Sequence, residues 1–132
     1  MIGILAMAAA AAAEPQPNCK NPMTQTDINI CAGRDARAAD AVMAREYGRA
    51  RMYMKRMDRA LDRKSDDRIT YSAALLASQR AWLKFRDAQC VIDGYSARGG
   101  SMESMVRSGC YEEITRDRTK QLQDVLKSYQ AP

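Results

Sequence analysis

Apolar residues recur along this chain at the spacing of a helix, and this periodicity restricts the fold more than any other feature. Between residues 25 and 62 they are separated by steps of three, four or seven, at Ile28, Ala32, Ala39, Met43, Tyr47, Ala50, Met54, Met57 and Leu61. Such steps place side chains on one face of an α-helix. No run alternates apolar and polar residues as a half-buried strand would, and no Asn-Gly hairpin turn occurs. The chain is therefore predicted to be all-α.

Three helices are predicted, forming an antiparallel domain with a long first helix and a helical hairpin. The first spans residues 25–62, and Thr24 is its predicted N-cap. A polar turn follows, in which Ser65 or Asp66 is predicted to cap the second helix, over residues 68–95.

Glycines end the second helix and form the turn of the hairpin. Gly99 and Gly100 are followed by Ser101, the predicted N-cap of a third helix that ends near residue 128. On one interpretation this segment only turns the chain and caps the third helix. The other is a narrow loop, poor in side chains, that enters the cleft of a partner enzyme. On that interpretation Gly99, Gly100, Ser101 and the nearby acid Glu103 are the candidate partner-binding residues.

The N-terminal residues 1–13 are apolar and rich in alanine, and Glu14-Pro15 follows them. This arrangement is typical of a secretory signal peptide with cleavage after Ala13, which leaves a mature domain of residues 14–132. The segment is shorter than the roughly 18 apolar residues of a membrane span. The domain is therefore expected in the periplasm or outside the cell. The alternative is an alanine-rich N-terminus on a cytosolic protein.

Four cysteines in a short exported chain favour two disulfides over four free thiols. A zinc site is disfavoured because there is no CxxC pair and no histidine. Cys90 lies ten residues before Gly100 and Cys110 lies ten after it, so an antiparallel hairpin brings both to the same height. Cys19 would then pair with Cys31 and hold an extended N-terminal arm against the first helix. Four cysteines allow three connectivities, and the other two stay open.

A second group of candidate residues lies on the second helix. Trp82, Arg86 and Cys90 are four residues apart and share one face. They form either an aromatic and arginine contact patch or a packed cluster in which Arg86 meets a carboxylate and Trp82 stacks on an arginine. The candidate members of that cluster are Asp40, Trp82, Arg86, Glu113 and Arg118.

Composition argues against catalysis and against nucleic-acid binding. Histidine is absent, which excludes the Ser-His-Asp and Cys-His arrangements, and no glycine-rich phosphate loop follows a strand. We expect that the protein is not an enzyme and that it uses no metal or cofactor. Its net charge is +5, but acidic and basic residues interleave, as in Asp58-Arg59 and Arg86-Asp87, and this is typical of a solvated helix face.

Several segments together resemble a known family. They are Thr24-Gln25, Asn29-Ile30-Cys31-Ala32, Ala39-Asp40, Gln79-Arg80-Ala81-Trp82, Phe85-Arg86-Asp87-Ala88-Gln89-Cys90, Gly99-Gly100-Ser101, Cys110, Thr115 and Arg118. Their order and spacing resemble the LprI-like family of secreted bacterial proteins, over roughly residues 19–126. The resemblance implies a helical fold with disulfides. Because the founding member is described as a lysozyme inhibitor, it also implies a protein partner, lysozyme. The chain lacks the lipid-anchor cysteine of the founding type.

The leading hypothesis is therefore an exported binding protein that occludes the cleft of a lysozyme. One alternative is a structural or stress-related protein of the cell envelope without inhibitory activity, and another is a binder of anionic surfaces through its arginines. The first hypothesis meets an electrostatic difficulty, since common animal lysozymes are cationic and this chain is basic. Binding would then need a local acidic patch.

Overall fold

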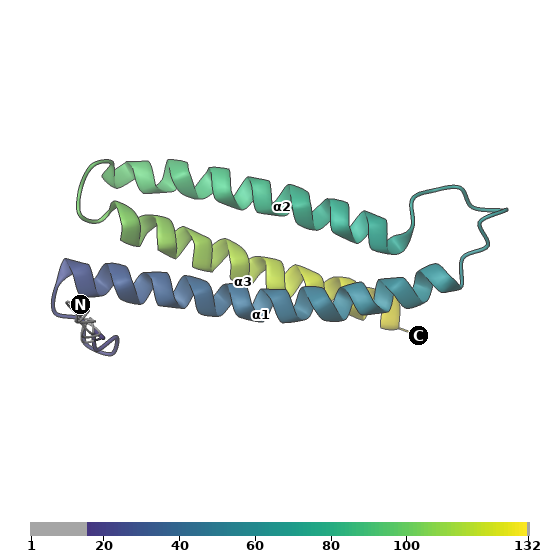
Figure 1. The fold of residues 1–132 in the computed structure, drawn as a ribbon, viewed down its shortest axis with the longest axis horizontal. Coiled ribbons are helices and arrows are strands. Elements are labelled where there is room, and N and C mark those ends of the chain that lie inside the picture. The colour runs from purple at the N-terminus through teal and green to yellow at the C-terminus, as the bar shows by residue number, and fades with distance from the viewer. Residues whose placement is uncertain (1–15, 132) are drawn as a thin grey trace, which may run out of the picture.

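The computed structural model describes residues 16–131, which form a three-helix bundle (Figure 1). Helix α1 spans Gln25–Arg59, α2 spans Tyr71–Gly94 and α3 spans Glu103–Gln130, with a short 3-10 helix, η1, at Tyr95–Ala97. The all-α class and the three helices are confirmed, and residues 16–131 contain no strand. The signal peptide expected at residues 1–13 lies outside the described residues.

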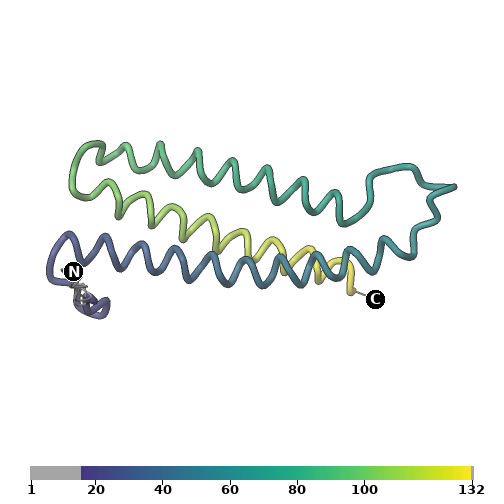
Figure 2. The backbone as a smooth tube through the Cα atoms, in the orientation of Figure 1, coloured from purple at the N-terminus to yellow at the C-terminus, as the bar shows by residue number. Residues whose placement is uncertain are grey.

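The helices run up, down and up, so each is antiparallel to the next one in the chain and α1 runs parallel to α3 (Figure 2). Helix α3 packs more extensively on α1 than on α2. Because α1 and α3 run in the same direction, the turn between α2 and α3 lies at the same end of the bundle as the start of α1 and the N-terminal arm (Figure 1). No helix within the described part of the chain is both long enough and apolar enough to cross a membrane.

Helix α1 begins as its sequence predicts. The Thr24 hydroxyl accepts a hydrogen bond from the Asp27 backbone N–H at 3.0 Å, and the Asp27 carboxylate accepts one from the Thr24 N–H at 3.1 Å. This capping box satisfies two of the N–H groups that the first turn leaves without a helical partner.

The start of α2 differs from the prediction. Thr70 is its N-cap and accepts a hydrogen bond from the Ala73 N–H at 3.2 Å, so neither Ser65 nor Asp66 caps it. Asp66 instead binds the guanidinium of Arg68 at 2.7 Å, and this hydrogen-bonded pairing lowers the pKa of Asp66 to about 2. The Ser65 hydroxyl donates to Asp62 at 3.0 Å. Because these local contacts hold residues 62–68 in a turn, α2 does not extend back to residue 68.

The start of α3 also differs, because Ser101 is not its N-cap. Helical geometry begins after Met102, whose side chain makes no capping hydrogen bond. The chain is still turning at Ser101, where Asn29 of α1 donates to the backbone carbonyl at 2.9 Å. The Ser101 hydroxyl is consequently left without a capping role in this turn.

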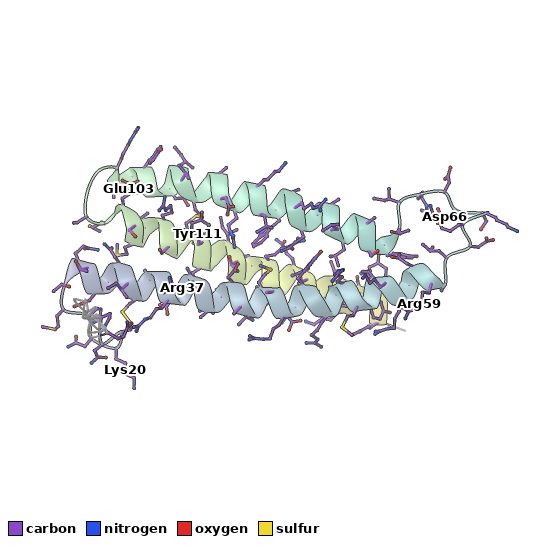
Figure 3. The ribbon with its side chains drawn as sticks, in the orientation of Figure 1. Lys20, Arg37, Arg59, Asp66, Glu103 and Tyr111 are labelled. Carbon is purple, nitrogen blue, oxygen red and sulfur yellow. A yellow bond between two sulfur atoms is a disulfide. The ribbon has the colours of Figure 1, made fainter. Side chains whose placement is uncertain are left out.

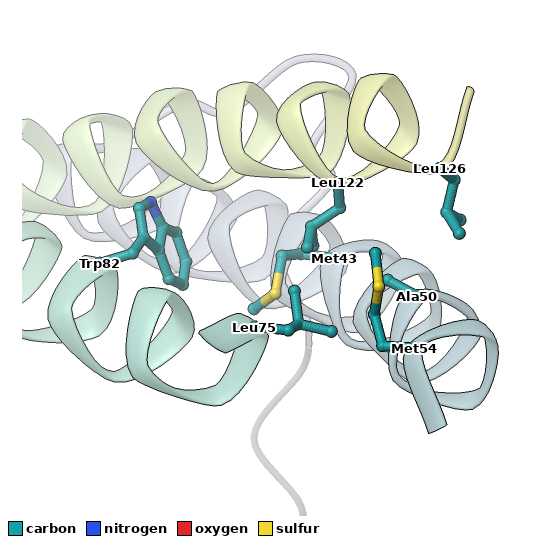
Figure 4. Close-up of a cluster of buried hydrophobic side chains, with 7 residues drawn as sticks. All are labelled: Met43, Ala50, Met54, Leu75, Trp82, Leu122 and Leu126. Atoms are coloured by element: carbon teal, nitrogen blue, oxygen red, sulfur yellow. The ribbon is translucent and has the colours of Figure 1, made fainter. Parts of the chain in front are cut away.

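The apolar core lies in the half of the bundle away from the N-terminal arm, and Figure 4 shows its side chains. It consists of Met43, Ala50 and Met54 from α1, Leu75 and Trp82 from α2, and Leu122 and Leu126 from α3. Leu122 and Ala50 are fully inaccessible to solvent. The other half of the bundle contains both disulfides and buries few large apolar side chains, so covalent bonds hold the end that carries the α2–α3 turn.

Candidate partner-binding site

Two disulfides brace the end of the bundle that carries the α2–α3 turn. Cys90 pairs with Cys110 across α2 and α3, with Cα atoms 5.4 Å apart, and Cys19 pairs with Cys31 at 5.5 Å. Figure 3 shows Lys20 of the arm and Glu103 of α3 at this end, with Asp66 and Arg59 at the opposite end. Both pairs are those that the hairpin symmetry about Gly100 favours.

The turn itself is fixed by hydrogen bonds from two sides. Gly99 adopts a φ of 76°, a left-handed conformation that glycine reaches without steric cost. Its backbone N–H donates to the Glu103 carboxylate at 2.8 Å, while Asn29 of α1 holds the carbonyl of Ser101. We call the turn at residues 99–101 the tip. It is thus tied both to the helix that follows it and to α1 across the bundle.

The tip presents mainly backbone and small side chains to solvent. Gly99, Gly100 and Ser101 are all exposed, and Glu103 is half-buried because it bonds to the turn. Met102, which directly follows the tip, is exposed, and so is Met23 at the end of the arm, with 79% of its surface accessible. A rigid, narrow projection of this kind can enter a concave surface with little loss of conformational entropy.

The second group of candidate residues is packed between the helices. The Arg86 guanidinium binds the Asp40 carboxylate at 2.8 Å and also bonds to Asp87 at 3.1 Å. It lies between two aromatic rings, 4.9 Å from the Trp82 centroid and 5.0 Å from that of Tyr111. Arg86 therefore joins α1, α2 and α3 through ion pairs and cation–π contacts.

Arg118 of α3 completes this cluster from within the bundle. Only 8% of its surface is accessible, and its guanidinium donates to Gln79 at 3.0 Å and to Ser78 at 2.9 Å. It lies 5.8 Å from the Trp82 centroid, on the same ring that Arg86 contacts. Burial lowers the pKa of Arg118. Because these groups are satisfied by one another, they connect the helices and leave little for a partner to bind.

Glu113 does not belong to the cluster, and its prediction as a partner of Arg86 was wrong. Tyr111 and Thr115 of α3 face Arg86, and the Thr115 hydroxyl accepts from it at 3.3 Å. These two residues are four apart and share a face, whereas residue 113 lies halfway between them and points away. Glu113 is exposed to solvent.

The residues described so far match a known family. The family model for lysozyme inhibitor LprI matches residues 17–122, which include all four cysteines, the Trp82 and Arg118 cluster and the tip. The chain belongs to the LprI lysozyme inhibitor family. The resemblance noted in the sequence is thereby confirmed.

Two curated relatives of this LprI-family chain carry no described activity. Uncharacterized protein R02472 of Rhizobium meliloti (strain 1021) is 44% identical over 124 residues, which cover 92% of this chain and 87% of the relative. Uncharacterized protein YecT of Escherichia coli (strain K12) is 37% identical over 75 residues, covering 54% of this chain and 44% of the relative. No solved structure matches the chain.

Sequence reasoning missed several residues that shape this LprI-family site. Asn29, which anchors the tip, and Tyr111, which stacks on Arg86, were not identified as members of either group. Asn29 stands inside the segment that carries the family resemblance, and a polar residue in the first turns of a helix facing a predicted hairpin turn was the available signal. Within residues 16–131, no group of three or more acidic or cysteine side chains is placed to hold a metal ion.

Proposed function

We propose that this protein is an exported, non-catalytic inhibitor that blocks the substrate cleft of a lysozyme with its α2–α3 tip. Residues 1–13 serve as the signal peptide and residues 14–132 form the mature domain. The observation that carries the proposal is the match to the lysozyme inhibitor LprI model over residues 17–122. The two disulfides support export, because such bonds persist in oxidising compartments.

The geometry of the tip supports its role as the inserted element. Gly99, Gly100 and Ser101 leave the backbone open to a partner, and the Cys90–Cys110 disulfide and Asn29 hold it in place. A lysozyme cleft is lined with groups that recognise hydrogen-bonding substrates, so the exposed Ser101 hydroxyl can replace a substrate contact. The N–H groups of Gly99 and Gly100 are already bonded within the protein, so the backbone contributes shape. The cost of ordering the loop is already met in the free protein.

Charge contributes little to this recognition. The chain carries a net charge of +5, and the acid at the tip, Glu103, has one carboxylate oxygen committed to the Gly99 N–H. Glu112 pairs with Arg116 at 2.7 Å. Inhibition of a cationic lysozyme should therefore rest on shape and hydrogen bonds, and should strengthen with ionic strength as salt screens the repulsion between two cationic proteins.

The test is lysis of bacterial cell walls by several lysozyme classes, with and without purified residues 14–132. The matched variants are Ser101→Trp at the tip and Asp67→Trp in the exposed turn at the other end. Because Ser101 is not a helix cap, an indole there blocks insertion without loosening α3. Circular dichroism confirms that each variant folds. The proposal expects Ser101→Trp to lose inhibition and Asp67→Trp to retain it.

Two results would contradict the proposal. If the wild-type protein inhibits no lysozyme class, the envelope-protein alternative replaces inhibition. If Ser101→Trp inhibits as well as the wild type, the tip is not the inserted element, although the family assignment stands. Edman sequencing of protein recovered from the periplasm checks cleavage after Ala13.

A further inference from the structure

Helix α2 carries a second apolar face that points away from the bundle. The residues of this face recur in steps of three and four and are continued by the first residue of η1. We call them the α2 stripe: Ala74, Ala77, Ala81, Phe85, Ala88 and Ile92 of α2, with Tyr95 of η1. All seven are exposed, including Phe85 at 56% and Ile92 at 59%. At 1.5 Å per residue the stripe is about 32 Å long, and no charged residue interrupts it.

The stripe lies opposite the face that α2 buries. The core-facing residues of α2 are Leu75, Gln79, Trp82, Cys90 and Gly94. At 100° per residue their mean direction is about 160° from that of the stripe, so the core does not account for it. Figure 1 shows α2 on the outside of the bundle, with α1 and α3 along its other side.

Helix α3 shows what a solvated outer face looks like in this protein. Its exposed positions carry charges at Arg107, Glu113, Arg116, Asp117, Lys120 and Asp124. A helix normally exposes such polar residues and keeps its apolar residues in one stripe toward the core. A helix that is apolar on both faces indicates that the outer face is covered by something.

The sizes of the side chains favour a second copy of this chain as the cover. The stripe begins with the small Ala74 and Ala77 and ends with the bulky Ile92 and Tyr95, while Phe85 stands at its centre between Ala81 and Ala88. An antiparallel two-fold arrangement places the bulky end of each copy over the small end of the other. Alternating large and small residues across facing positions is how helices pack closely.

One register pairs the bulky end of the stripe with its small end. With the two-fold axis midway between Lys84 and Phe85, Ala77 faces Ile92 of the second copy. Ala74 then faces Tyr95, and Ala81 faces Ala88. Each contact occurs twice, as an isologous interface requires. Phe85 lies nearest the axis, where it meets Phe85 of the second copy, and the small Ala81 and Ala88 on either side leave room for the two rings.

The rim of this arrangement brings opposite charges together. Arg80, Lys84 and Asp87 lie along one flank of the stripe, and all three are exposed. In an antiparallel two-fold pair the same flanks meet, and Asp87 of the second copy falls at the height between Arg80 and Lys84. The two Lys84 side chains also meet beside the axis, and the two Asp87 carboxylates offset their repulsion.

We propose that the protein forms an antiparallel dimer through the α2 stripe. The interface is separate from the tip proposed to enter lysozyme, so it does not depend on that function. Stable interfaces bury about 800 Å² on each partner, and a single helix face provides at most about that much. The dimer should therefore form at high micromolar concentration and dissociate on dilution.

The experiment is sedimentation velocity of purified residues 14–132 over a range of concentrations. The wild type should shift to twice the monomer mass as its concentration rises. Phe85→Glu and Ile92→Glu place a charge in the seam and should remain monomeric with unchanged helicity. The matched control is Met52→Glu on α1, which alters an equally exposed apolar residue outside the stripe and should dimerise like the wild type.

Cysteine cross-linking tests the register. Lys84 lies beside the two-fold axis, so Lys84→Cys should form a disulfide-linked dimer under mild oxidation. Ala77→Cys should not, because the two copies of that residue are about 22 Å apart along the axis. A wild type that stays monomeric at every concentration overturns the proposal, as does a dimer that survives Phe85→Glu. Binding of a monomer to anionic vesicles, lost in the stripe variants, would assign the stripe to a membrane surface instead.

Discussion

Replacing Cys90 and Cys110 together by alanine should destabilise the protein far more than the same replacement of Cys19 and Cys31. The Cys90–Cys110 bond joins residues 20 apart, and both sulfur atoms are buried within a packed hairpin. The bond restricts the unfolded chain, whereas the native hairpin remains packed against α1 without it.

The expected magnitude follows from the length of the closed loop. Closing a loop of this size removes about 11 cal/mol/K from the unfolded chain, or about 3 kcal/mol at 25 °C. The described domain unfolds with an entropy of about 0.24 kcal/mol/K, from an average of about 2.1 cal/mol/K per residue. The melting temperature should therefore fall by roughly 10–15 °C.

The control pair, Cys19 and Cys31, should behave differently because its bond holds only the N-terminal arm. Cys19 belongs to an exposed arm with few buried side chains. Without its disulfide the arm gains conformational freedom in the native state as well as in the unfolded state. The entropy change of unfolding, and with it the stability, therefore changes little. We expect a loss below about 1 kcal/mol for this pair.

Thermal melts followed by far-ultraviolet circular dichroism, with urea titrations for the free energy, measure both effects. The wild type, each double variant and the variant without any cysteine form the series. Equal shifts for the two pairs would refute the reasoning, since they would show that the arm is as firmly packed as the hairpin. A shift of only a few degrees for the Cys90 and Cys110 pair would show that the hairpin loosens when its bond is lost.

Three further substitutions test the turn, a helix interior and the core. Gly99→Ala should lower stability by about 1 kcal/mol because a side chain is strained at a φ of 76°, while Gly109→Ala, at a helical position with open space around it, should raise stability by up to about 1 kcal/mol. Leu122→Ala should cost about 3–4 kcal/mol in urea unfolding because Leu122 is fully buried among the core residues, and a cost near zero would mean that the core is not packed around it.

The helices could be predicted because their signals are local. The apolar spacing of α1 and the capping box at Thr24 and Asp27 involve neighbours in the chain, and the structure forms both. The Cys90–Cys110 pair also follows from a local symmetry, since both lie equally far from Gly100. Position along the chain was sufficient for each of these features.

The remaining features depend on contacts that spacing does not show. The N-cap of α2 moved to Thr70 because Asp66 found a nearer partner in Arg68. Ser101 lost its capping role because Asn29, 72 residues earlier, fixes the turn. Arg86 pairs with Asp40 rather than Glu113 because the rotation of α3 about its axis is set by packing on α1. The α2 stripe was in the sequence, but only the buried face of α2 made it recognisable as unaccounted for.

The pairing of the cysteines also bears on how the chain acquires its bonds. Cys19 joins Cys31 and Cys90 joins Cys110, so every cysteine bonds to its nearest neighbour in sequence. A chain that enters an oxidising compartment N-terminus first exposes Cys19 and Cys31 well before the later two. Oxidation in order of arrival then gives the native bonds directly, without the slow reshuffling that crossed connectivities require. Such a chain should mature with an oxidant alone and make little demand on a disulfide isomerase.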